Sequence, residues 1–586
     1  MTRIERLLGA TAGEEVELPV DLIVTDDWTT PALRAPLESL GCERSAVPIV
    51  LVRDHTLSEE HYRGEEKARV KRLRETEEWF VSRFGATLIS GQGIQHHVLP
   101  GSGLLRPGML VLGNDSHTPT LAAYGVTAFA AQPTTIAVAV HTGKLVLRVP
   151  ESLLVRVEGR LPAGVSVRDA SLTLLDLLRG GGQVPRLATG MALEFSGPGL
   201  VGLSESQRAV LANATPEAVA VTCTFPLHGE AESGQADLLL DLSAARPSLA
   251  RSGQPADVIS LSEFGHTRVD RVFVGTCAGG TYEEVRDFAE ALGGARVAVP
   301  TIVAPASLET EARLRREGIL ARLEAAGVTL LPPGCGPCFG FGVGRLADDE
   351  VAVVTGNRNS LGRMGSPRAQ IHLASGRTAG EAALRGSIGA RQGGQVERPS
   401  GARPVVVWPR SGNVVRLLGT ITTDDITPSA VPGVGTSSDP DPGVVRRLLF
   451  HHLDPSSAER NLAGAVIVAD ENFGVGSNRA SSVRALQLAG VAAVIVRSFA
   501  PLYAMGARDE GLLLLRITED EFYDLATPEA QVVVDPDGGS VRVGGSVFSV
   551  SRPSPYEQQL RAAGGVVAWL RSRQGGPMAQ LRPLPT

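Results

Sequence analysis

The chain of 586 residues is too long for a single hydrophobic core, so about two to four compact units are expected. A hydrophobic fraction of 43% and a charged fraction of 20% are typical of a folded globular protein and exclude extensive disorder. The net charge of −7 disfavours binding to nucleic acid or to a membrane surface, while a local basic pocket for an acid stays open.

Cysteine usage indicates a reducing, cytoplasmic setting. The chain has five cysteines, no positively charged start followed by an apolar stretch, and no run of about 18 apolar residues. Cys42 and Cys223 stand alone, and an isolated cysteine usually acts as a small buried hydrophobic residue. We expect that role for both.

Short β-branched runs alternate with helix-like segments from residue 20 to about residue 390, which predicts an α/β fold with largely buried sheets. The runs are 21–25, 47–52, 109–112, 271–274 and 351–355. Each run ends at a polar motif. Open α/β sheets bind ligands at the carboxyl ends of their strands, so these motifs are candidates for a common site.

Residues 391–404 are rich in Gly, Pro, Gln and Arg and lack apolar periodicity, which predicts a linker. The linker divides the chain into a first region, 1–390, and a second domain, 405–586. The second domain is predicted to contain two buried strands and one helix, at 465–470, 491–496 and 481–488.

The remaining three cysteines lie in G-T-C at 275–277 and G-C-G-P-C at 334–338. Cys277, Cys335 and Cys338 can supply three thiolates to a cubane cluster that needs four ligands, which leaves one iron open as a Lewis acid. A C-x-x-C pair alone is more typical of zinc or redox chemistry. Its combination with N-R-N-S-L-G-R at 357–363 favours an iron–sulfur hydro-lyase.

Histidines next to acids form a second group of candidates. His55 follows Asp54, His117 lies two residues after Asp115, and His96 lies in another polar run. A carboxylate beside an imidazole fixes its tautomer and raises its basicity, as a proton shuttle requires. The alternative for each histidine is a structural role in a turn.

Arginines form the third group. Arg358 and Arg363 are five residues apart, a spacing that allows two guanidinium groups to converge on a carboxylate. Ser477 and Arg479 follow a predicted strand and two glycines, at a predicted helix N-terminus that favours anions. Solvated loops and a structural Gly-rich turn are the alternatives.

In their order, these motifs resemble the aconitase and isopropylmalate isomerase superfamily of 4Fe-4S hydro-lyases. The matching runs are D-D-W-T-T-P, D-H-T, G-Q-G-I-Q-H-H-V-L-P, G-N-D-S-H-T, N-A-T-P-E, G-T-C, G-C-G-P-C, N-R-N-S-L-G-R-M-G-S-P, T-T-D-D-I-T-P and G-V-G-S-N-R. The resemblance spans nearly the whole chain, and residues 91–175 look most like the large subunits of isopropylmalate isomerase and homoaconitase. It implies a multi-lobed α/β region with three α/β subdomains, fused to a C-terminal swivelling β/α domain.

The resemblance also implies roles for single residues. The 4Fe-4S cluster would have one labile iron that binds substrate, with Cys277, Cys335 and Cys338 as ligands and Asn213 and Asn357 beside them. The acid and imidazole pairs would be His96 with Glu217, Asp115 with His117, and Asp54 with His55. Substrate carboxylates would contact Ser116, Arg358, Arg363, Asn478 and Arg479. Ser477 would take the α-proton, and Asp424 would orient the second domain's side of the site.

Departures from the family pattern bear on the substrate. The usual G-S-C-T-N reads G-T-C-A-G-G at 275–280, and the usual S-S-R-E-H reads S-N-R-A-S at 477–481, which alters hydrogen bonding around the site. Pro31 stands where aconitases generally have glutamine, and the segment after Asp424 lacks the arginine that recognises citrate's extra carboxylate. Citrate is therefore disfavoured.

The predicted function is isomerisation of a small hydroxy di- or tricarboxylate by dehydration and rehydration. The substrate could be citrate-like, isopropylmalate-like or homocitrate-like, or a phosphonate-bearing malate. Two alternatives come from other classes: a cluster-free RNA-binding regulator, which the acidic net charge disfavours, and a zinc or redox protein. We expect a monomer or weak oligomer with no nucleic-acid or membrane partner.

Overall fold

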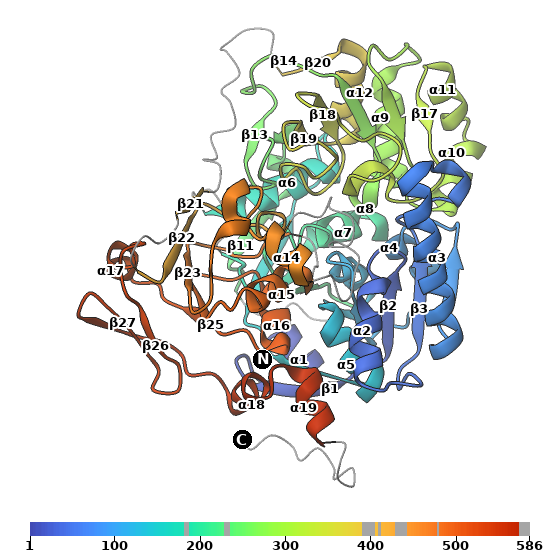
Figure 1. Ribbon diagram of the computed structural model, residues 1–586. Helices are drawn as coiled ribbons and strands as arrows, with labels where there is room; N and C mark the ends of the chain where they lie inside the picture. Colours follow the sequence, from blue (N-terminus) through green and yellow to red (C-terminus); the bar gives the residue numbers. More distant parts are fainter. Residues whose placement is uncertain are drawn as a thin grey trace.

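The computed structural model describes residues 1–180, 187–227, 235–389, 405–407, 412–427, 442–476 and 480–573. These residues form an α/β protein with several largely parallel sheets, as predicted. In Figure 1 the N-terminal sheet lies at the right, a larger mixed sheet at the top and the C-terminal sheet at the left. None of the described helices is long and apolar enough to cross a membrane.

The N-terminal sheet has five parallel strands in the order β4-β3-β2-β5-β6. The strands are β2 (Leu22–Asp26), β3 (Ile49–Arg53), β4 (Thr87–Ser90), β5 (Leu110–Gly113) and β6 (Thr127–Ala130). Helix α2 (Arg34–Ser39) joins β2 to β3, α3 (Gly64–Phe84) joins β3 to β4, and α5 (Pro133–Thr142) follows β6. β2 is buried at every position, which explains its apolar run, and the strands predicted at 21–25, 47–52 and 109–112 are confirmed.

The mixed sheet has seven strands in the order β13-β12-β19-β18-β15-β16-β17. They are β12 (Ser248–Ala250), β13 (Val258–Ser260), β15 (Arg271–Val274), β16 (Thr301–Val303), β17 (Thr329–Leu330), β18 (Val351–Val354) and β19 (Gln370–Ala374). Helices α9 (Tyr282–Leu292) and α12 (Gly376–Arg385) pack together against the sheet, while α10 (Leu308–Arg316) and α11 (Ile319–Ala325) join β16 to β17. The strands predicted at 271–274 and 351–355 are confirmed.

A third, four-stranded parallel sheet has the order β10-β9-β8-β11. Its strands are β8 (Ser152–Glu158), β9 (Ala192–Ser196), β10 (Thr222–Thr224) and β11 (Leu238–Asp241), accompanied by α6 (Val167–Arg179) and α7 (Glu205–Ala212). Two small antiparallel pairs, β1 (Glu15–Pro19) with β7 (Lys144–Arg148) and β14 (Thr267–Arg268) with β20 (Ser387–Ile388), complete this region. Cys42 and Cys223 are both buried, as expected.

The C-terminal part contains a five-stranded sheet in the order β21-β22-β23-β24-β25. Its strands are β21 (Val405–Val407), β22 (Val414–Leu418), β23 (Val466–Ala469), β24 (Ala493–Val496) and β25 (Leu514–Arg516). Its helices include α13 (Thr423–Ile426), α14 (Pro442–Leu448), α15 (Ala480–Leu488), α16 (Pro501–Glu510) and α17 (Asp520–Leu525). The predicted strands at 465–470 and 491–496 and the helix at 481–488 are confirmed. The proposed linker, 391–404, lies outside the described residues.

The chain ends, within the described part, in a three-stranded antiparallel sheet and two helices. The strands are β26 (Val533–Asp535), β27 (Ser540–Val543) and β28 (Ser546–Ser549), and the helices are α18 (Pro555–Ala563) and α19 (Val566–Arg573). Trp569 of α19 belongs to an apolar cluster that packs against Val138 and Val146 of the N-terminal region. The last two helices therefore pack the C-terminal part against the first region.

Helices α16 and α5 form the centre of this contact. The hydroxyls of Thr134 and Thr135, in the first turn of α5, donate hydrogen bonds to the carboxylates of Glu510 and Asp509. The N-cap residue of α5, Gln132, makes no capping bond through its side chain. Carboxylates are favourable at a helix N-terminus, so the C-terminal part completes a helix of the first region.

Gly506 sits where α16 and α5 approach most closely, and it predicts a measurable stability effect. In an exposed helix interior, glycine to alanine stabilises by up to about 1 kcal/mol. Here a methyl group at residue 506 would overlap the buried side chain of Gln132, and overpacking costs about 1–3 kcal/mol. We expect Gly506→Ala to lower the melting temperature, whereas Gly202→Ala, which meets nothing within 4 Å, should not. An unchanged melting temperature in Gly506→Ala would contradict this contact.

Candidate active site

Carboxyl ends of strands from two sheets supply the candidate site. β2, β3 and β5 end beside Asp26, Asp54 and Asp115, while β15 and β18 precede Cys277 and Asn357. Parallel strands bring their carboxyl ends to one edge, which explains how motifs far apart in the chain converge.

The three candidate cluster cysteines occupy two short helical turns. Cys277 lies in α8 (Thr276–Gly279), Cys335 is the N-cap residue of the turn Gly336–Phe339, and Cys338 lies within that turn. All three are partly buried and free of disulfides. Burial raises the pKa of Cys277 and of Cys335, and the neighbouring cysteines raise both further. A metal must therefore displace protons from closely spaced thiols when it binds.

Two asparagines surround Cys277, as predicted for Asn213 and Asn357. The Cys277 thiol donates to Asn213 Oδ1 at 3.3 Å, and Asn357 Nδ2 lies 3.3 Å from the same sulfur. Asn357 Nδ2 also donates to Asn213 Oδ1. Thr120 accepts from Asn213 Nδ2 at 2.7 Å, which holds the amide in place.

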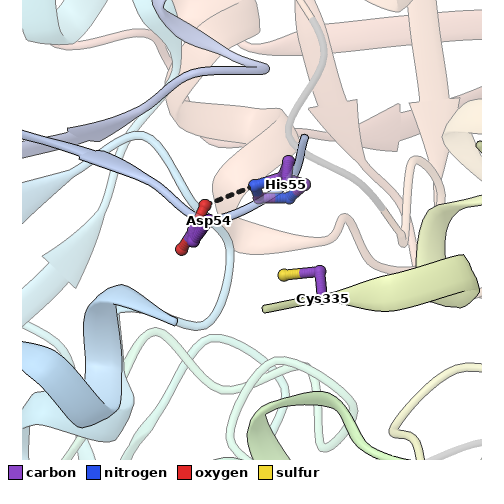
Figure 2. A group of neighbouring side chains, drawn as sticks. All are labelled: Asp54, His55 and Cys335. Atoms are coloured by element: carbon purple, nitrogen blue, oxygen red, sulfur yellow. Dashed lines mark hydrogen bonds and ion pairs between the residues drawn. The ribbon is translucent and has the colours of Figure 1, made fainter. Parts of the chain in front are cut away.

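His55 lies among carboxylates and close to Cys335 (Figure 2). Its Nδ1 is 2.7 Å from Asp54 Oδ1, and the Cys335 backbone donates to the Asp54 carbonyl at 2.9 Å. Figure 2 shows the Cys335 sulfur pointing toward this pair, and one ligand atom from each of the three residues lies within 4.8 Å of the others. The predicted pair of Asp54 and His55 is thus formed beside Cys335, a candidate cluster ligand.

Two further acids flank His55 that the sequence did not single out. Asp26 Oδ1 lies 3.7 Å and Asp27 Oδ1 4.0 Å from His55 Nδ1. Burial raises the pKa of Asp26 to about 7. Asp27 accepts bonds from the backbone of residues 54–56 and so fixes the loop that carries His55.

The predicted partner of His96, Glu217, is wrong, whereas the predicted pair of Asp115 and His117 is formed as an ion pair. His96 Nε2 lies 3.2 Å from Asp115 Oδ1, and His117 Nε2 lies 3.1 Å from Glu217 Oε1. Asp115 also accepts from the His117 backbone at 2.6 Å, but its carboxylate is 3.7 Å from that imidazole. The His117 ring therefore lies between Asp115, at its Nδ1, and Glu217 on the segment after α7, at its Nε2.

Several buried polar atoms around these pairs have no hydrogen-bond partner among the described residues. They are His96 Nδ1, Glu217 Oε2, Asn357 Oδ1 and both amide atoms of Gln95. A buried polar atom without a partner costs about 1–3 kcal/mol, so such a group of atoms is typical of a site that a ligand completes.

The predicted substrate arginines lie on two sides of the same centre. Arg358 Nε donates to Glu217 Oε1 at 3.0 Å, and Arg363 Nη2 lies 3.7 Å from Cys338 Sγ. Burial would lower the pKa of Arg363, but Cys338, Asp424 and Asp115 raise it overall. Arg363 therefore carries a positive charge beside the turn Gly336–Phe339, which contains Cys338 and is called the cluster turn below.

The C-terminal part lines a cleft together with residues of the first region. The cleft is lined by Glu217 and Arg358 from the first region and by Asp424 and Gly476 from the second. Ser116 lines an adjoining pocket that also contains Gly476. Ser477, Asn478 and Arg479, the predicted base and anion-binding residues, lie outside the described residues. Their neighbour Gly476 nevertheless reaches the cleft.

Other residues missed from the sequence stabilise this arrangement. His97 Nε2 is 2.8 Å from the Cys277 carbonyl, and burial lowers the pKa of His97 to about 4. The fully buried Arg168 donates to Ser171 at 3.3 Å and to the Gly356 carbonyl, just before Asn357. The H-H pair at 96–97 was a signal for His97, whereas nothing near Arg168 in the sequence marks its contact 188 residues away.

The chain is similar to known proteins over most of its length. The aconitase family model (aconitate hydratase) matches residues 21–232 and 240–386, and the aconitase C-terminal domain model matches residues 456–520. The 3-isopropylmalate dehydratase large subunit of Pyrococcus horikoshii is 37% identical over 396 residues, 68% of this chain and 100% of that protein. The homoaconitase large subunit of Thermus thermophilus is 37% identical over 397 residues, 64% of this chain and 92% of that protein. A solved 3-isopropylmalate dehydratase chain from Methanocaldococcus jannaschii, 29% identical, covers 28% of this chain and 93% of its own, with a TM-score of 0.25.

The fold and the candidate site define an α/β protein in which cysteines, acid and imidazole pairs and arginines lie near one another. The chain belongs to the aconitase family of hydro-lyases. Membership implies a 4Fe-4S cluster. These relatives give no support to an RNA-binding regulator or to a zinc or redox protein.

Proposed function

We propose that this protein isomerises a small hydroxy di- or tricarboxylate by removing and re-adding water. One observation carries the proposal: three partly buried cysteines lie together with three acid and imidazole pairs and two arginines. Dehydration next to a carboxylate needs a base on one side and a Lewis acid with a proton donor on the other. The site has residues for each of these needs.

The residues present fit the cluster. Cys277, Cys335 and Cys338 would hold it, and the two asparagines that contact the Cys277 sulfur would orient that ligand. When bound with one iron that lacks a thiolate, a 4Fe-4S cluster supplies a Lewis acid for the substrate hydroxyl. Cys42 and Cys223 are buried elsewhere and do not contribute.

His55 is best placed to protonate the leaving hydroxyl. Burial alone would lower the pKa of His55, but Asp54, Asp26 and Asp27 outweigh it and hold this pKa well above its usual value. The imidazole is therefore protonated at neutral pH and can donate. Asp54 engages Nδ1, so Nε2 is the nitrogen that would face the substrate.

The acids of the two other pairs, Asp115 and Glu217, have lowered pKa values. Burial would raise the pKa of Asp115, but His96, His117 and His55 keep it below its usual value. Burial likewise opposes ionisation of Glu217, yet His117 and Arg358 lower its pKa overall. Both acids are thus ionised and can hold the imidazoles of His96 and His117 in position near the leaving group.

Ser477 is our proposal for the base that takes the α-proton. Its neighbour Gly476 lines the cleft with Arg358 and Glu217. Serine alone is a poor base, so its alkoxide would need the nearby arginines and the N-terminal end of α15 to offset its cost. Asn478 and Arg479 would bind a substrate carboxylate from the same turn.

We propose that the C-terminal domain, residues 405–586 after a linker at 391–404, is the swivelling domain. The relatives above are named large subunits, and this chain carries the second part of the cleft itself. We propose that the single chain completes the site without a separate small subunit, and that it is a monomer or weak oligomer in a reducing, cytoplasmic setting.

A screen of candidate hydroxy acids as substrates tests this function. We expect citrate to be a poor substrate, because Arg358 and Arg363 clamp two anionic groups and leave a less charged wall for a third arm. Arg446 and Arg447, the first arginines after Asp424, are exposed on α14. The anaerobic enzyme should be assayed with citrate, isocitrate, 2- and 3-isopropylmalate, homocitrate and phosphonate analogues. A kcat/KM for citrate at least equal to that of every other acid would refute this specificity.

Oxygen sensitivity tests the labile iron. Because one iron would lack a thiolate, we expect air to inactivate the enzyme and iron with a thiol reductant to restore activity. The measurement is a time course of turnover in air, followed by anaerobic reconstitution. Full activity after prolonged exposure to air would not fit an open iron.

A further inference from the structure

An aromatic and basic pocket lies on the outer side of the cluster turn, apart from the cleft described above. Its volume is about 240 Å³, and Trp28, Phe339 and Phe341 form its apolar wall. Arg69, Arg72 and Arg345 also line it. None of the residues that line this pocket has a role in the proposed mechanism.

The aromatic wall is built as one packed unit. The Trp28 ring centroid lies 4.8 Å from that of Phe339 and 5.1 Å from that of Phe341. Tyr62 packs behind Phe341 at 5.2 Å. Aromatic rings packed in this way present a stiff apolar surface, to which a ligand can bind with little loss of side-chain freedom.

Positive charge lies directly on this wall. The Arg69 guanidinium lies 4.1 Å from the Trp28 ring centroid and 5.6 Å from that of Phe341. Burial and the like charge of Arg72 lower the pKa of Arg69 to about 10. An anion in the pocket would offset both effects, because its charge would compensate the partly desolvated Arg69 and the neighbouring, exposed Arg72.

The acids in the pocket do not neutralise it. Glu65 and Glu66 line it as well, and Glu66 lies 3.6 Å from Arg345. Three arginines against two glutamates leave one net positive charge. A planar guanidinium over a ring can stack and still donate to a carboxylate or a phosphonate.

The pocket also touches the catalytic centre. Phe339 directly follows Cys338, and its ring lies edge-on to His55 with 5.0 Å between centroids. Gly362 lines the pocket next to Arg363. A molecule in the pocket would therefore contact Phe339, which lies next to Cys338 in the chain and packs against His55.

We propose that this pocket binds a small organic anion with an apolar body. The anionic group contacts Arg69, Arg72 and Arg345, and the apolar body packs on Trp28 and Phe339. The anion is either a remote arm of the substrate or a separate molecule, and both have the same chemistry. The proposal does not depend on turnover and goes beyond the proposed reaction.

Calorimetric titration of the anaerobic holoenzyme with phenylphosphonate tests the proposal. Inorganic phosphate supplies the charge alone and benzyl alcohol the apolar body alone. We expect saturable binding of phenylphosphonate about tenfold tighter than either control, a difference typical of one well-placed group. The double variant Arg72→Gln with Arg345→Gln should lose that tenfold. Its matched control, Arg315→Gln with Arg385→Gln, removes exposed arginines paired with glutamates on other helices and should bind normally.

A catalytic-cleft variant separates the two places where an anion could bind. Arg358→Gln should keep phenylphosphonate binding. Loss of binding in Arg358→Gln but not in the Arg72 and Arg345 double variant would place the anion in the cleft and overturn the proposal, as would absence of saturable binding. Once a turnover substrate is known, competition with phenylphosphonate identifies the occupant as a substrate arm, and simultaneous binding identifies it as a separate molecule.

Discussion

Cys335→Ser is expected to be colourless, to lack iron and acid-labile sulfide, and to lose about a thousandfold or more of turnover. Cys335 is a candidate cluster ligand, and its sulfur points toward the Asp54 and His55 pair. A bound metal acting as a Lewis acid supplies several kcal/mol to the transition state, and ~4 kcal/mol corresponds to about a thousandfold in rate.

Cys42→Ser is the matched control for that variant. Cys42 is also buried, and its thiol donates to the Arg44 carbonyl at 3.2 Å, a bond that a serine hydroxyl can keep. The control should retain colour, iron and turnover when purified anaerobically. A colourless Cys335→Ser protein with wild-type turnover would exclude the cluster from the reaction.

Asp115→Asn is expected to lower kcat by about 10²- to 10⁴-fold, the usual contribution of general acid–base catalysis. Asp115 lies 3.2 Å from the His96 imidazole and accepts from the His117 backbone, so one carboxylate orders two histidines. The amide carries no negative charge, so it is a weaker hydrogen-bond acceptor than the carboxylate. Steady-state kinetics measures the loss, and the iron and sulfide content should stay at the wild-type level because no cluster ligand is changed.

Asp176→Asn provides the control for the loss of a paired carboxylate. Asp176 accepts from Arg179 at 2.7 Å on α6, and 45% of its side chain is exposed. It should be fully active. If Asp115→Asn kept wild-type kcat, the acid and imidazole network would not take part in the rate-limiting chemistry.

The sequence predicted the elements that carry the site better than the contacts within it. β2, β3 and β15 are buried parallel strands, so their continuous apolar runs and polar ends are visible locally. The predicted partner of His96 was wrong, and Glu217 lies at His117 instead, because these contacts depend on how α7 and the N-terminal sheet meet. Glu217 is 100 residues from His117 in the sequence, so the local sequence around the histidine does not indicate this contact.

Other parts of the site depend on distant packing in the same way. The three carboxylates around His55 come from two strand ends, and only their side-by-side register shows that they surround one imidazole. Phe339 was part of no motif, yet its ring contacts His55. Such contacts arise from tertiary structure and have no local periodicity.

Deuterium exchange tests the central claim most directly. The anaerobic enzyme is incubated in heavy water with each acid of the substrate panel, and proton NMR follows the carbon next to the carboxylate. Removal and return of water requires that at least one acid gain deuterium at that carbon, at a rate abolished in Cys335→Ser. A protein with its full complement of iron and sulfide that exchanges no deuterium into any of these acids would contradict the account.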